Sequence, residues 1–220
     1  MKINLIKGNL VLIAVLYLIT SGCNLRDKDG NTYKTIKINN QEWLAKNLNV
    51  NTFRNGDSIP KAQTDEEWEK AGKEGRPAWC YNNDPENGKK YGKLYNWYAV
   101  KDSRGLAPAG WHVPTEAEWS QLIDFLGGGE VVGTKMKSAE GWARNGNGTN
   151  EIGFSGLPGG SRAGNGTFGE SGGGTIGGWW SSTDVYTKYA WIRYLTNIDG
   201  RAYKDYYLKE LGFSVRCVRD

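Results

Sequence analysis

The stretch from Gly110 to Leu126 constrains the fold most, because it combines a complete set of helix-start signals with an apolar stripe. Thr115 and Glu118 have the spacing of a capping box, in which each side chain accepts from the backbone N–H of the other residue. Pro114 keeps the helix from beginning earlier. Apolar side chains then recur every three or four residues, at Trp119, Leu122, Ile123 and Leu126. The pattern predicts an amphipathic helix that ends at the glycines after Leu126.

A second short helix is predicted by the same spacing earlier in the chain. Thr64 and Glu67 repeat the capping box, and Trp68 follows as the first large apolar residue. Gly72 marks the end of the pattern, so the helix is expected to extend to about Ala71.

Two hairpins are expected, one near each end of the domain. The first joins residues 33–38 to residues 42–45 through Asn39-Asn40, and the second joins 189–195 to 202–208 through a type I′ turn at Asp199-Gly200. After it, a final strand is predicted with alternate residues on one face, namely Phe213, Val215 and Cys217.

The middle of the chain is harder to assign from periodicity. Residues 94–100 are apolar enough to be buried, either as a strand or as a helical turn. Residues 127–178 hold most of the glycine and show no clear period, and their widely spaced anchors are Trp142, Phe154, Leu157 and Phe168. This region is expected to be an ordered, functional loop region.

The N-terminus has the features of a targeting signal. Lys2 and Lys7 precede an apolar run from Leu10 to Ile19, and small residues then lead to Cys23. This arrangement resembles a bacterial lipobox, so residues 1–22 are expected to be a lipoprotein signal peptide and Cys23 the lipidated first residue. Residues 23–30 are expected to be a charged tether. The alternative is an uncleaved anchor helix, although the apolar run is shorter than the ~20 residues of a membrane span.

Several runs in the same chain carry a family resemblance. The run from Gly110 to Trp119 is similar to the Pro-Thr-Glu-Ala-Glu-Trp segment of the formylglycine-generating enzyme superfamily. A closer resemblance is to the Fibrobacter succinogenes major paralogous domain family of bacterial envelope proteins, and it is carried also by residues 33–38 followed by 42–48, and by residues 79–85, 92–98 and 212–218. The resemblance implies an α+β, C-type lectin-like fold of the formylglycine-generating enzyme variant. It implies one loop-rich domain over residues 31–220, with two or more short helices packed on small antiparallel sheets.

The cysteines suggest one covalent link. With Cys23 lipidated, Cys80 and Cys217 remain, and two cysteines in an oxidising compartment allow a single pairing. The C-terminal run around Cys217 is similar to one whose cysteine is structural in formylglycine-generating enzymes. We therefore expect a Cys80–Cys217 disulfide.

Several activities are excluded by what the sequence lacks. His112 is the single histidine, so iron or zinc sites that need two or more histidines cannot form, and we expect His112 to be structural. The resemblance implies that formylglycine generation needs a cysteine pair in the C-terminal half, where only Cys217 occurs. A glycosidase needs two carboxylates placed across a cleft. The carboxylates near Asp65 and near Glu116 instead lie at helix starts, where acidic residues are expected for capping. Lys2 and Lys7 belong to the segment expected to be removed, which lowers the formal charge of +4 by two and gives no case for nucleic acid.

The sequence offers residues for a cation site and for an aromatic site. Residues 82–87 are rich in oxygen donors, which suits calcium, but the sugar-binding signatures of C-type lectins are absent. No metal or cofactor is therefore assigned, and Asp84 and Glu86 are the secondary candidates for calcium. The positive signal is aromatic, because exposed Trp and Tyr can stack on sugars or line protein interfaces. The candidate ligand-binding residues are Trp179, Trp180, Tyr186, Trp191, Tyr203 and Tyr206.

The sequence leaves three functional hypotheses. The favoured one is a non-catalytic lipoprotein of the cell envelope, anchored in the outer membrane by the lipid on Cys23, that binds an extracellular glycan or a protein partner. The first alternative is a structural or assembly lipoprotein without a soluble ligand, in which the same aromatic residues form a core. The second is a divergent enzyme of the formylglycine-generating superfamily.

Overall fold

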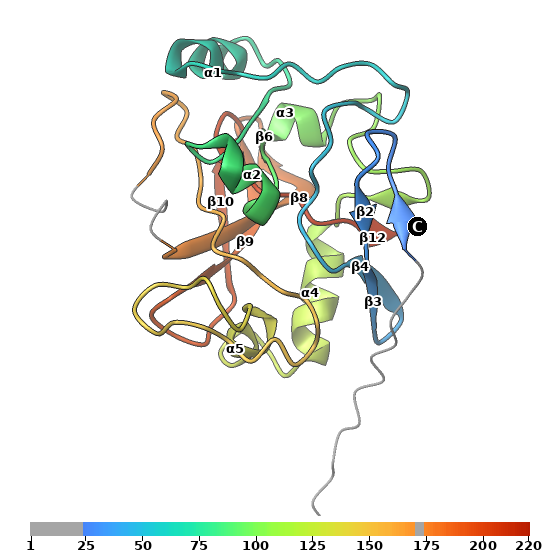
Figure 1. Cartoon of the computed structure of the whole chain (residues 1–220), viewed down its shortest axis with the longest axis vertical. Helices are drawn as coiled ribbons and strands as arrows, with labels where there is room; N and C mark the ends of the chain where they lie inside the picture. The colour runs from blue at the N-terminus through green and yellow to red at the C-terminus, as the bar shows by residue number, and fades with distance from the viewer. Residues whose placement is uncertain (1–23, 170–173) are drawn as a thin grey trace, which may run out of the picture.

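A computed structural model of the chain describes residues 24–169 and 174–220 (Figure 1). The protein is a mixed α+β structure in which small antiparallel sheets are joined by long connections and short helices. The predicted signal peptide, residues 1–22, and the predicted lipidation site, Cys23, lie outside the described residues.

Both predicted helices are confirmed, each with its capping box. In α4 (Glu116–Phe125), Thr115 Oγ1 accepts from the N–H of Glu118 at 3.3 Å, and the Glu118 carboxylate accepts from the N–H of Thr115 at 2.8 Å. In α1 (Asp65–Lys73), Thr64 and Glu67 make the same reciprocal pair. The apolar stripe of α4 is buried, as its spacing predicts.

The other helices are short: α2 (Pro85–Tyr91), α3 (Trp97–Val100) and α5 (Val132–Met136). The ambiguous stretch 94–100 contains both expected structures, because β6 (Leu94–Asn96) passes directly into α3. Asn96 makes this change possible, since its side chain accepts from the N–H of Ala99 at 3.1 Å and caps the helical turn.

One sheet brings the two ends of the domain together. Its strand order is β3-β4-β12-β7, with β3 (Thr35–Ile38) and β4 (Gln41–Leu44) forming the predicted N-terminal hairpin. The C-terminal strand β12 (Val218–Arg219) lies between β4 and β7 (Trp111–His112), and Val218 is paired with Trp43 (Figure 1). A smaller sheet has the order β11-β6-β5, with β11 at Gly212–Phe213 and β5 at Trp79–Cys80.

The largest sheet lies between two hydrophobic cores. It has the order β10-β9-β8, with β8 at Ile176–Tyr186, β9 at Tyr189–Thr196 and β10 at Tyr203–Leu208. On one face, Trp179 and Leu195 pack with the stripe of α4. On the other, Trp180 and Ile192 pack with a core that includes Phe213. Both faces of the inner strands are therefore covered.

The segment expected to be a tether is folded. β1 (Leu25–Arg26) pairs with β2 (Thr32–Tyr33), which adds a two-stranded ribbon at the start of the domain. The Asp27 carboxylate accepts from the Tyr33 hydroxyl at 2.8 Å, and Asp29 accepts from the Thr52 hydroxyl at 2.8 Å. The charges that indicated a solvated linker instead fix this segment to the body of the domain.

Two predictions about the C-terminal region need correction. The hairpin of β9 and β10 forms, but Tyr194 pairs with Tyr203, so its connection is longer than a type I′ turn. Gly200 serves close packing there, because a Cβ atom at this position would lie 2.6 Å from Oγ1 of Thr134. The final strand is broken into β11 and β12, and Arg216 between them is as buried as its neighbours, because its guanidinium donates to the carbonyl oxygens of Leu44 and Phe154.

The expected disulfide is not formed. Cys80 and Cys217 are both free and buried, and they belong to different hydrophobic clusters. Burial raises the pKa of the Cys80 thiol to about 11 and raises that of Cys217 further, so each packs as a small apolar group. The pairing prediction depended on compartment and resemblance, neither of which fixes the distance between two side chains.

Within the part of the chain that the structure describes, no helix has the length and apolar character needed to cross a bilayer.

Candidate functional site: an exposed aromatic face

The six aromatic residues singled out from the sequence fall into three groups. Trp179 and Trp180 are 1% and 0% exposed, and their indole N–H groups donate to Asn47 Oδ1 and to the carbonyl of Tyr95, each at 2.8 Å. Both rings belong to the cores described above. The prediction that they contact a ligand is therefore wrong.

Three others gather on one exposed surface, together with Tyr189. The ring of Tyr206 makes edge-type contacts with Tyr186, Tyr189 and Trp191, at centroid distances of 6.2, 5.7 and 5.6 Å and interplanar angles of 85–86°. Tyr186 is 65% exposed and Tyr206 is 43% exposed. We call these four residues the aromatic face.

Strand register explains why these rings meet. Tyr206 of β10 lies directly opposite Trp191 of β9, and Tyr186 of β8 lies opposite Tyr189. Side chains two residues apart on a strand share a face, so Tyr189 and Trp191 point to the same side. The register shifts in β8 between Trp180 and Tyr186 occur where that strand passes from the core to this surface.

Tyr203, the sixth candidate, lies on the other face of β10. It is three residues from Tyr206 and stacks on Tyr194 with a centroid distance of 4.8 Å and an interplanar angle of 10°. The strand β10 therefore presents two separate aromatic surfaces.

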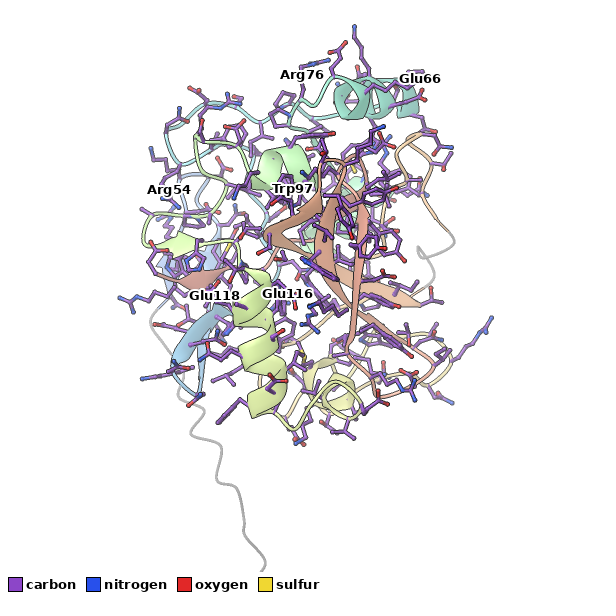
Figure 2. All side chains as sticks on the ribbon, turned by 180° about the vertical axis from the view of Figure 1, so that it is seen from behind. Arg54, Glu66, Arg76, Trp97, Glu116 and Glu118 are labelled. Atoms are coloured by element: carbon purple, nitrogen blue, oxygen red, sulfur yellow. The ribbon has the colours of Figure 1, made fainter. Side chains whose placement is uncertain are left out.

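An ionic cluster, whose Glu116 and Arg193 are buried and whose Lys204 is exposed, lies next to the aromatic face. Glu116, the first residue of α4, is buried, and Lys204 Nζ lies 3.0 Å from its Oε1 atom. The same amino group lies 4.2 Å from the ring centroid of Trp191. Arg193 and Ser120 also donate to this carboxylate oxygen. Figure 2 shows Glu116 at the end of α4 that abuts the strands of the large sheet.

Both cations of this cluster, Arg193 and Lys204, pair with the carboxylate of Glu116. The carboxylate of Glu116 lies in the first turn of α4, where the helix dipole favours a negative charge. Two cations then share one acid, and the Lys204 amine is held between that acid and the indole of Trp191. Lys204 and Glu116 were not identified from the sequence as parts of a binding site, because the pairing joins segments far apart in the chain.

His112 bridges two carboxylates at the same, N-terminal end of α4. Its Nδ1 lies 2.7 Å from Asp220 and its Nε2 lies 2.7 Å from Glu118. Burial alone would lower the imidazole pKa, but the hydrogen bonds to Asp220 and Glu118 outweigh it, so the pKa is raised. With both ring nitrogens engaged by carboxylates, His112 joins the C-terminus to the helix cap.

The secondary calcium candidates have local partners. Asp84 caps α2 by accepting from the N–H of Glu86 at 2.8 Å, and the Glu86 carboxylate lies 2.9 Å from Lys89 Nζ. Over residues 24–169 and 174–220, no group of three or more His, Cys, Asp or Glu side chains is placed to hold a metal ion.

The fold and site define an α+β domain with an exposed aromatic surface that lies beside an ionic cluster. Residues 36–219 match the model of the Fibrobacter succinogenes major domain. The chain belongs to this family. No curated protein and no solved structure matches the chain.

Proposed function

We propose that the domain is a non-catalytic binding module of an envelope lipoprotein, and that its aromatic face contacts an extracellular glycan. The observation that carries the proposal is the cluster around Tyr206, in which four rings meet at a surface where Tyr186 and Tyr206 remain largely accessible to solvent. Rings held by one another lose little conformational entropy when a ligand covers them.

The chemistry around the rings suits a polyhydroxylated ligand. Tyrosine hydroxyls and the Lys204 amine supply hydrogen-bonding groups beside apolar ring surface, which is the combination that fixes the orientation of a sugar. The module needs no cofactor for this role.

A glycan is favoured over a partner that would add a strand to the sheet. β10 is an edge strand, and strand addition needs unpaired backbone groups along it. The side chain of Asp205 accepts from the N–H of Tyr206 at 2.8 Å and places a charge beside this edge. This bond occupies one backbone donor of the edge and leaves the ring surface open.

The anchoring part of the proposal comes from the sequence. Residues 1–22 would be removed as a signal peptide, and Cys23 would carry the lipid that holds the protein at the outer membrane. We also propose that the fold is a variant of the C-type lectin-like fold. The pairing of β4 with β12, which joins the two ends of the domain, supports this assignment.

A glycan array probed with the purified full chain in detergent tests the binding role. The wild type should bind a defined set of oligosaccharides, and a Trp191→Ala/Tyr206→Ala double variant should lose at least about tenfold in apparent affinity, the loss typical of truncating aromatic contact residues. Circular dichroism spectra should show that both proteins are folded. Equal binding by the two proteins, or no binding by the wild type, would reject the proposal.

A further inference from the structure

The residues that follow the predicted lipidation site already belong to the folded domain. Asn24 is the first described residue, and β1 begins at Leu25. Leu25 pairs with the buried Tyr33, and the following turn is bound to the domain through Asp27 and Asp29. The chain is therefore fixed to the domain from Leu25 onward.

This arrangement limits how far the domain can stand from a lipid anchor. Two peptide units separate Cys23 from Leu25, and they span at most about 7 Å. The polar headgroup layer on each side of a bilayer is about 5–8 Å thick. If Cys23 carries a lipid, as the proposed function states, the surface around Leu25 must lie among the headgroups.

The surface around Leu25 has the chemistry of a membrane contact. A groove of about 410 Å³ lies between the β1–β2 ribbon and the loops at residues 50–54 and 106–109. Its apolar lining includes the partly exposed Leu25 and the buried side chains of Phe53 and Leu106. Its charged lining consists of three bases and one acid, a net of two positive charges, contributed by Arg26, Lys28, Arg54 and Asp27.

The bases of this groove are available to an anionic surface. Arg26 and Lys28 are exposed and, among the described residues, form no ion pair. Arg54 donates to the carbonyl oxygens of Ala107 and Trp111 at 3.0 and 2.7 Å, which fixes its guanidinium at the groove without neutralising it. The acid, Asp27, is turned toward Asn31 and Tyr33, from which it accepts hydrogen bonds.

The groove and the aromatic face lie on different sides of the domain. In Figure 1 the blue β1–β2 ribbon is at the right of the molecule, whereas β9 and β10 are at its left. A bilayer that contacts the ribbon would therefore lie on the side of the domain opposite these strands.

We propose that this basic groove is a membrane-docking surface that rests on anionic lipid headgroups and holds the aromatic face outward. The lipid on Cys23 places the surface at the bilayer, and the three bases select the orientation. Each base near an anionic leaflet favours the docked orientation by about fivefold. The proposal rests on the anchor that the proposed function assigns to Cys23, but it does not depend on the identity of the glycan.

Hydrogen–deuterium exchange of the full lipidated chain in vesicles tests this orientation. Intact-mass analysis first establishes the lipid on Cys23. Exchange is then compared between vesicles of phosphatidylcholine alone and vesicles that also contain phosphatidylglycerol. Amides of residues 25–28, 52–54, 105–107 and 109 should exchange on the order of tenfold more slowly in the anionic vesicles, and residues 203–207 should not change.

Charge reversal provides the matched control. Arg26→Glu/Lys28→Glu should abolish the added protection, whereas Lys70→Glu/Lys73→Glu, which changes the charge equally on the distant helix α1, should keep it. A chain without lipid on Cys23, protection that is independent of anionic lipid, or protection of residues 203–207 would each overturn the proposal. Oligosaccharide binding is measured on the same vesicles, so that failure of membrane docking is distinguished from failure of the aromatic face to bind a glycan.

Discussion

Replacing Trp180 with alanine distinguishes a core ring from a ligand-contacting ring. The indole is fully buried, its N–H donates to the Tyr95 carbonyl at 2.8 Å, and its ring meets Phe213 edge-on at 4.9 Å. Truncating a buried tryptophan costs roughly 3–5 kcal/mol, and the Tyr95 carbonyl would also lose its partner. In a domain of this size, 1 kcal/mol corresponds to about 2–4 °C, so the melting temperature should fall by roughly 6–20 °C.

Thermal and urea unfolding of the full chain in detergent measure this effect. Trp180→Phe should lie between the wild type and Trp180→Ala, because it keeps a six-membered ring in the core but loses the N–H donor and the volume of the five-membered ring. Tyr206→Ala, on the exposed face, should change the free energy of unfolding by about 0.5 kcal/mol or less. If Trp180→Ala unfolded within ~2 °C of the wild type and lost oligosaccharide binding instead, the assignment of this ring to the core would be wrong.

Two further predictions concern buried or bridged groups elsewhere. The pKa of His112 is raised in the folded state, so its bonds to Asp220 and Glu118 should stabilise the domain fully below the unfolded value of about 6.5, and this contribution should be lost as pH rises through the folded pKa. The Glu118 pKa is lowered, because its bonds to Thr115 and His112 outweigh burial, so its own contribution is lost in acid. Urea denaturation of the wild type and His112→Gln measures the difference in their free energies of unfolding at pH 5.5 and at pH 9. This difference should be larger at pH 5.5, and an equal difference at the two pH values would contradict the prediction. Cys80 and Cys217 should react with a thiol reagent only after unfolding, and two thiols per chain should then be detected without reductant. Detecting no thiol would show that the two cysteines form a disulfide.

The helices could be predicted from sequence because their determinants are local. Thr115 and Glu118 are three residues apart, and both halves of their capping box lie within one turn. The stripe that ends at Leu126 needs only the helical period to show which side is buried. The determinants of the hairpin at Asn39 were equally local, and this turn residue has a positive φ, a conformation that asparagine tolerates.

The division of the aromatic residues could not be predicted in the same way. Alternation shows that Trp179 and Trp180 point to opposite faces of β8, but it does not show that both faces are covered. Their partners, Asn47 and Tyr95, are 132 and 85 residues away in the chain. Only the assembled sheet shows that the side chains of β8 become exposed beyond Trp180, toward Tyr186.

Charged residues were assigned wrongly from the sequence where their side chains form hydrogen bonds with other parts of the domain. Asp27 and Asp29 have the composition of a solvated linker, yet their carboxylates accept hydrogen bonds from the Tyr33 hydroxyl and from the backbone near Thr52. Glu116 is a similar case. It was expected to favour the start of a helix, but its carboxylate also pairs with Lys204, which contacts the aromatic face. Such double roles become visible only when distant segments are brought together.

The central claim is that an extracellular glycan is bound by one face of the strand β10. The most direct test is the dissociation constant of an array-selected oligosaccharide, measured by isothermal titration calorimetry on the wild type, Tyr206→Ala and Tyr203→Ala. The two variants remove the same side chain from opposite faces of one strand. We expect Tyr206→Ala to bind at least about tenfold more weakly and Tyr203→Ala to bind within about twofold of the wild type. Equal losses in both variants, or a loss in Tyr203→Ala alone, would contradict the account.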